Sequence, residues 1–97
     1  MINISTLSIL GRQYDVIIKD EMVETGLCDY EGATISIKSG QVLHREVDTL
    51  LHECIHAIDE CMQTHLTERQ VYCITVGVLA LLKDNEHVLQ YINESLN

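Results

Sequence analysis

The hydrophobic period of this chain changes near residue 40, and this change restricts the fold more than any other feature. Apolar and polar residues alternate over 2–9, 14–18 and 34–37, which is the pattern of half-buried strands, with turn residues between them. From residue 41 onward, apolar residues recur at helical spacing. The 97 residues are therefore predicted to form one α+β domain, 1–97. Its N-terminal sheet, antiparallel or mixed with three or four strands, occupies 1–40, and helices occupy 41–97.

The first predicted helix runs to about residue 62 and has two well-separated sides. Leu50, Cys54, Ile58 and Cys61 belong to its apolar side, whereas His52 and His56 lie near the middle of its polar side. We expect the apolar side to pack on the sheet, with Cys54 and Cys61 as buried, reduced thiols. The two histidines should then point into a cleft or into solvent.

A second helix is predicted to begin at a capping box in which Thr67 is the N-cap and Gln70 follows three residues later. Residues 71–82 are apolar almost all round, so this helix is either centrally buried or part of a homodimer interface. Gly77 within it is expected to permit close helix approach. A short last helix is predicted near 86–96.

Residues 52–56 read HECIH, an instance of the HExxH motif. His52 and His56 are four apart, so on a helix both imidazoles reach one metal ion. Glu53 then lies where it can take a proton from a metal-bound water. This arrangement is typical of zinc hydrolases, usually peptidases.

A catalytic zinc needs a third protein ligand, and the sequence offers several. Glu68, in the first turn of the second helix, is the preferred candidate. Glu60 and Asp59 lie too far along the first helix and fit better as hydrogen-bond partners of a ligand histidine. Cys73 belongs to an apolar run, so it is expected in the core, and a water or another residue stays possible as the third ligand.

Three further histidines and two tyrosines have weaker claims to a role. Single surface positions are expected for His44, His65 and His87, although His65 lies beside Glu68 in sequence. Tyr30 and Tyr72 are able to polarise a carbonyl, but nothing in the sequence selects them.

Charge and composition limit the partners. The net charge of −9 at pH 7 argues against nucleic acid or an anionic membrane and permits a basic protein substrate. The apolar run 71–82 is too short to span a bilayer. The first ten residues, MINISTLSIL, lack the basic start and long apolar stretch of a signal peptide, so a cytoplasmic location with reduced cysteines is expected.

The stretch TLLHECIHAID, residues 49–59, resembles the active helix of small zinc metallopeptidase-like proteins from bacteriophages and prophages. Those proteins are similar to gluzincins and to metallopeptidase domains of phage immunity and stress regulators. LTERQV at 66–71 and LLKDN at 81–85 resemble the second helix of that family, and the resemblance covers roughly residues 26–85. It implies a bacterial or phage-infected host cell and a short sheet before the motif helix.

The same resemblance assigns the site residues. His52 and His56 correspond to zinc ligands, Glu53 to the general base and Glu68 to the third ligand. Two departures argue against efficient general proteolysis: the chain leaves no room for a substrate-cleft lobe, and Glu68 follows the motif sooner than in large gluzincins.

Three hypotheses follow. The first is a zinc-dependent peptidase, in which Glu53 accepts a proton as water attacks a peptide carbonyl and the substrate pairs with the sheet edge near 34–37. The second is a catalytically silent, zinc-stabilised binding module that acts on a host or phage protein. The third is a metal-free structural domain that carries the motif by coincidence.

Overall fold

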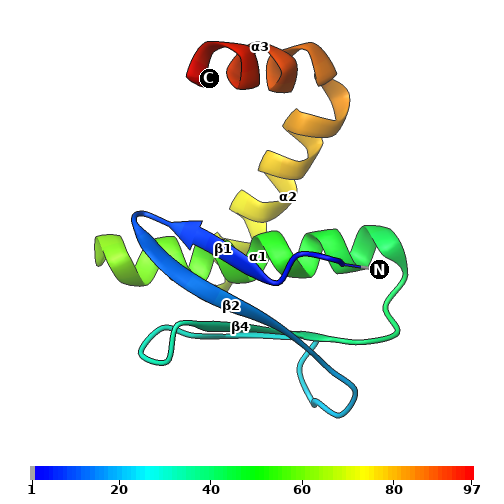
Figure 1. Cartoon of the computed structure of the whole chain (residues 1–97), viewed down its shortest axis with the longest axis vertical. Coiled ribbons are helices and arrows are strands. Elements are labelled where there is room, and N and C mark those ends of the chain that lie inside the picture. Colours follow the sequence, from blue (N-terminus) through cyan, green and yellow to red (C-terminus); the bar gives the residue numbers. More distant parts are fainter. Residues whose placement is uncertain (1) are drawn as a thin grey trace.

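The structure, a computed structural model, describes residues 2–97. Its elements follow in the order β1 (Thr6–Ile9), β2 (Arg12–Lys19), β3 (Gly26–Asp29), β4 (Thr34–Lys38), α1 (Leu43–Met62), α2 (Glu68–Asp84) and α3 (Glu86–Leu96). A sheet is therefore followed by three helices, as the change of period predicts (Figure 1).

The sheet is mixed, with strand order β1-β2-β4-β3. A two-residue turn joins β1 to β2, and Leu10 and Gly11 both have positive φ there, 51° and 81°. Glycine adopts this conformation without strain, which explains its place in the turn. β2 runs parallel to β4, and β4 forms an antiparallel hairpin with β3 around Glu31-Gly32. The predicted turns are thus confirmed.

The order of strands overturns one expectation. Residues 34–37 belong to β4, which pairs with β2 on one side and β3 on the other, so they are not at a sheet edge. Among the described strands, the edges are β1 and β3. β3 is short and precedes β4 in the chain. No local sequence pattern indicates that β3 lies at the edge of the sheet and β4 inside it.

α1 covers one face of the sheet (Figure 1). Tyr14 and Val16 of β2, Ile35 and Ile37 of β4 and Ala57 of α1 form the buried core, which Leu50 and Cys54 flank. The side of α1 that is most enclosed includes polar residues: Glu46, Thr49, Glu53 and Asp59 are all buried. Thr49 and Glu53 lie against Gly26 at the start of β3, and Asp59 lies against the turn that follows α1.

Two expectations about buried cysteines are wrong. Cys61 is exposed because it lies in the last turn of α1, and Ile58 and Met62 near it are also exposed. Cys73 is exposed because α2 leaves the body of the protein after its first turns, and only Val71 and Thr75 of that helix are buried. All four cysteines are free in the structure.

α2 rises away from α1, and α3 lies across its far end (Figure 1). Among the described elements α3 contacts only α2, and none of its residues is buried. Most apolar side chains of this two-helix arm, residues 76–96, therefore remain exposed or only partly covered.

Candidate metal centre

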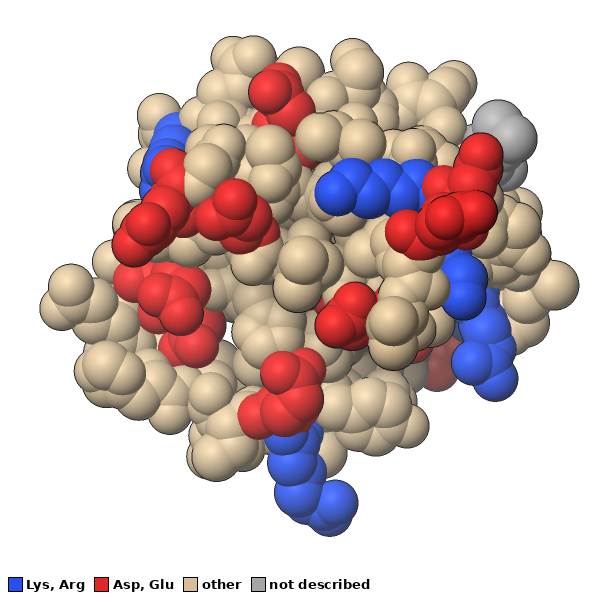
Figure 2. All heavy atoms as spheres, turned by 90° about the horizontal axis from the view of Figure 1, so that it is seen from below, with Lys and Arg blue, Asp and Glu red and all other residues tan. Residues whose placement is uncertain are grey.

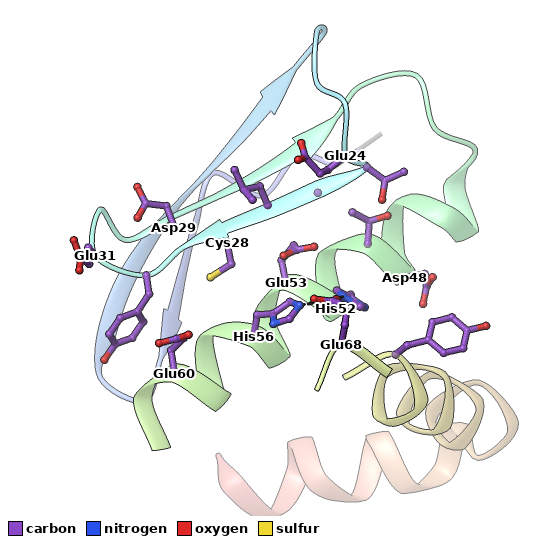
Figure 3. Close-up of a pocket in the computed structure, with 16 residues that line it drawn as sticks. Glu24, Cys28, Asp29, Glu31, Asp48, His52, Glu53, His56, Glu60 and Glu68 are labelled. Carbon is purple, nitrogen blue, oxygen red and sulfur yellow. Dashed lines mark hydrogen bonds and ion pairs between the residues drawn. The ribbon is translucent and has the colours of Figure 1, made fainter. Parts of the chain in front are cut away.

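His52, His56 and Glu68 converge on one point (Figure 3). The Nε2 atoms of the two histidines are 3.2 Å apart. Oε1 of Glu68 lies 2.6 Å from Nε2 of His52 and 2.9 Å from Nε2 of His56. The three predicted ligands are thus brought together, and as a group they can hold a metal ion.

The spacing of these atoms suits a small tetrahedral ion. Ligand atoms about 2.05 Å from a tetrahedral metal lie roughly 3.3 Å from one another. The separation of 3.2 Å between the histidine nitrogens matches this edge. The carboxylate is closer to both rings than such an edge requires, so a small outward shift of Glu68 makes room for the ion. Its side chain is 74% exposed, which leaves it free to make that shift.

The turn between α1 and α2 explains how Glu68 reaches the histidines. α1 continues to Met62, so the site closes because the two helices cross at a steep angle (Figure 1). Gln63 and His65 adopt left-handed φ values of 55° and 56°, which reverse the chain within a few residues.

Asp59 holds this turn. Its carboxylate accepts hydrogen bonds from Oγ1 of Thr64 at 2.5 Å and from the backbone N–H of Leu66 at 3.0 Å. These bonds hold the pKa of Asp59 below its usual value. The expected contact between Asp59 and a ligand histidine is therefore replaced by a contact with the turn. The predicted capping box follows, with Thr67 Oγ1 accepting from the N–H of Gln70, so that α2 begins at Glu68 itself.

Hydrogen bonding from His56, and secondarily from His52, lowers the pKa of Glu68. The carboxylate is therefore ionised at neutral pH, which is the form that ligates metal ions.

Glu53 lies beside the three converging residues and is only 7% exposed (Figure 3). Burial raises the pKa of this carboxyl group, although His52 and His56 oppose the shift. Its surroundings include Gly26 at the start of β3, where an added Cβ would lie 3.0 Å from the Glu53 carboxylate and 2.5 Å from Thr49. The close approach of β3 to α1 thus fixes where Glu53 lies.

A cavity of about 790 Å³ opens over these residues, between β3 and α1. From α1, Asp48, His52, His56 and Glu60 line it at four-residue spacing, together with Thr49 and Glu53. The other wall comes from residues 24–31, which include all of β3. Tyr72 of α2 and Tyr30 also line the cavity, whereas His65 and His87 do not.

The sequence pattern misses several of these lining residues, namely Glu24, Cys28, Asp29, Glu31 and Asp48. The helical spacing of Asp48 from His52 is a usable signal, but the β3 residues become visible only once the strand order is known. Burial, with the Glu53 carboxylate nearby, raises the pKa of the Cys28 thiol to about 11. This thiol is therefore neutral at pH 7.

Comparison with models of known protein families, with curated proteins and with solved structures gave no match. None of the described helices combines the length and apolar character needed to cross a bilayer.

Proposed function

We propose that this protein is a zinc-dependent metallopeptidase-like hydrolase, with His52, His56 and Glu68 as zinc ligands and Glu53 as general base. One observation carries the proposal: two imidazoles and one carboxylate converge within 4.8 Å, and a buried second carboxylate lies beside them in an open cavity. Two histidines and a glutamate are the ligand set of several catalytic zinc sites, and they leave a fourth position for water. The resemblance of residues 49–59 to phage metallopeptidases supports the same reading.

Zinc bound here would lower the pKa of a coordinated water to about 7 and polarise a peptide carbonyl. With the ion in place, Glu53 would accept a proton from the attacking water and donate it to the leaving amine. The Glu53 side chain is buried against Gly26 of β3, which restricts the movement of its carboxylate.

β3 provides the means to orient a peptide. It is an outer strand of the described sheet and forms one wall of the cavity. An extended peptide that pairs with part of its outer edge would run past Glu53 and the histidines. This edge replaces the one expected near 34–37.

The test uses zinc-loaded protein with a library of quenched fluorescent peptides. Wild type is expected to cleave some of them, and chelation should abolish cleavage until zinc is restored. Glu53→Gln should keep zinc and the fold but lose cleavage by a factor of at least about 100. Undiminished cleavage by this variant would contradict the role of Glu53.

A zinc-stabilised binding module is the second candidate, and a specific feature favours it. Of α2 only Val71 and Thr75 are buried, so a metal held between His52 and Glu68 would clamp a helix that packing alone holds weakly. In that case Glu53→Gln should leave biological activity intact, whereas His52→Ala should unfold or inactivate the protein.

A further inference from the structure

The charges around the cavity point to the class of substrate, and this inference rests on the proposed function. Five carboxylates line the cavity besides Glu53 and Glu68: Glu24, Asp29, Glu31, Asp48 and Glu60. Neither lysine nor arginine is among the lining residues. A bound Zn²⁺ offsets the charges of Glu53 and Glu68, so the five remaining carboxylates leave the cleft negative.

These carboxylates flank the metal group, which is His52, His56 and Glu68, on both sides (Figure 3). Glu24 and Asp48 lie at one end of the cleft, and Asp29, Glu31 and Glu60 lie at the other. Arg12 is close to the second end, but it donates to the main-chain carbonyl of Glu31 and lies over the ring of Tyr30. Over the face of the molecule seen in Figure 2, acidic side chains also make up most of the charged surface.

Helix geometry sets the distances along the cleft. Asp48 and Glu60 are each six residues from the midpoint between the histidines, which is about 9 Å along the helix axis at 1.5 Å per residue. An extended peptide advances about 3.3 Å per residue, so the same distance corresponds to two or three residues.

We propose that the cleft selects peptides with lysine or arginine two or three residues on either side of the bond that lies over the metal group. A cationic side chain at these positions would meet a carboxylate at each end of the cleft. An acidic peptide would be repelled along its whole length. The selective groups are Asp48 and Glu60 on α1 and the acids that border β3.

The expected effect is moderate because the acids are partly in water. An opposite charge pair about 6 Å apart in a water-like medium changes affinity roughly twofold at physiological salt. Two lysines should therefore favour binding roughly three- to fourfold over two glutamines, and raised salt should shrink this ratio.

The test compares two fluorescent peptides of equal length that differ only in having two lysines or two glutamines around a neutral apolar centre. Binding is measured by anisotropy on zinc-loaded Glu53→Gln protein, and kcat/KM on wild type. The double variant Asp48→Asn/Glu60→Gln removes two of the five carboxylates, one at each end of the cleft, and should clearly reduce the preference for lysine. The control Asp15→Asn removes a charge from β2, outside the cavity lining, and should leave the preference unchanged.

Binding tests the preference for cationic peptides, and cleavage tests the proposed peptidase activity. Preferred binding of the lysine peptide without cleavage would support the cationic specificity and count against the peptidase. Equal binding of both peptides, or a preference that is undiminished in the double variant, would overturn the specificity whether or not cleavage occurs.

A second inference comes from the exposed side of α2. Between Arg69 and Lys83 this helix carries no charged residue. Cys73, Gly77 and Ala80 follow one another at helical spacing on the exposed side, with the exposed side chains of Ile74 and Leu81 beside them. A glycine inside a helix is unfavourable relative to alanine, yet nothing lies within 4 Å of a Cβ built at Gly77. No contact among the described residues therefore accounts for this glycine.

We infer that the exposed side of α2 pairs with α2 of a second copy, antiparallel and crossing at Gly77. Gly77 is near the middle of α2, as a two-fold axis through the crossing requires. The small residues allow close approach, and Ile74 and Leu81 would be covered. Arg69 at one end would then face Asp84 of the partner subunit. The two-fold axis would repeat this pair of opposite charges at the other end of the interface. The metal ligand Glu68 is on the same helix, so pairing would also steady the site.

The test is sedimentation of wild-type protein from about 1 μM to 0.5 mM, the range in which an interface of one helix pair is expected to form. Gly77→Gln should give a monomer, whereas the smaller Gly77→Ala should weaken pairing less. Asp84→Arg should also weaken pairing, and Arg69→Asp added to it should restore the dimer. A wild type that is monomeric throughout this range would overturn the pairing and would indicate that α2 is covered by a different protein. A dimer that Gly77→Gln leaves intact would also overturn it.

Discussion

Gly26→Ala is expected to damage both the fold and the site, because β3 and α1 touch at this residue. The added methyl group would lie 2.5 Å from Cγ2 of Thr49 and 3.0 Å from both Cγ and Oε2 of Glu53. Thr49 is buried, and its hydroxyl donates to Gln41 at 3.1 Å, so it cannot turn aside without losing this bond. Overpacking of this kind costs about 1–3 kcal/mol. For a domain of this size that corresponds to a fall in Tm of at least roughly 4 °C.

Thermal unfolding followed by circular dichroism measures this loss, and zinc-dependent cleavage measures the shift of Glu53. Gly32→Ala is the matched control: the three atoms nearest its added methyl group all belong to the Asp29 side chain, which is exposed and can move into solvent at the cost of one exposed hydrogen bond from the Gly32 N–H. We expect a smaller loss of Tm for the control and little change in cleavage. A Gly26→Ala variant with the Tm and activity of wild type would refute the close contact between β3 and α1.

Four further predictions follow from the site and its supports. Chelation should lower the free energy of unfolding, by about 4 kcal/mol if free zinc is 1,000-fold above its Kd, and calorimetry with and without chelator checks this. Thr67→Ala removes the α2 cap, which should cost about 0.5–2 kcal/mol in a melt and weaken zinc binding in a competition titration. Because the pKa of Asp59 is lowered, its contribution to stability is present at neutral pH and lost as pH falls below its usual pKa of 3.8; Asp59→Asn should therefore flatten the acid limb of a Tm–pH profile. Because burial raises the pKa of Glu53, its ionised form destabilises the metal-free fold at neutral pH. Glu53→Gln should therefore raise the Tm of metal-free protein more at pH 7 than near pH 4. A change of the opposite sign in any of these measurements would contradict the corresponding contact.

Local patterns were sufficient to predict the parts of the structure that depend on neighbours in sequence. Alternation gave β2, the helical period gave α1, and the capping box at Thr67 and Gln70 gave the start of α2. The histidine pair needs only the geometry of one helix, which is why its orientation was predictable.

Properties that depend on distant parts of the chain were harder to predict. The position of β4 inside the sheet follows from its parallel pairing with β2, which no local pattern encodes. Cys61 and Cys73 have apolar neighbours, but whether they are buried depends on how far α1 and α2 extend beyond the sheet. The closure of Glu68 onto the histidines depends on the turn held by Asp59, whose role is visible only in three dimensions.

The acidic cleft was predictable only in part. Asp48 and Glu60 continue the four-residue spacing of the histidines, so their shared face follows from the sequence. That residues 24–31 lie across from them follows only from the outer position of β3.

Zinc content measured by elemental analysis on purified wild type, Glu68→Ala and Glu60→Ala tests the central claim most directly. Glu60 is a matched control, because it is an acid of the same cavity that does not join the converging group. We predict about one zinc per chain in wild type and in Glu60→Ala, with loss or strong weakening in Glu68→Ala. Folded wild-type protein that contains no zinc and binds none when it is added would contradict the proposed metal centre.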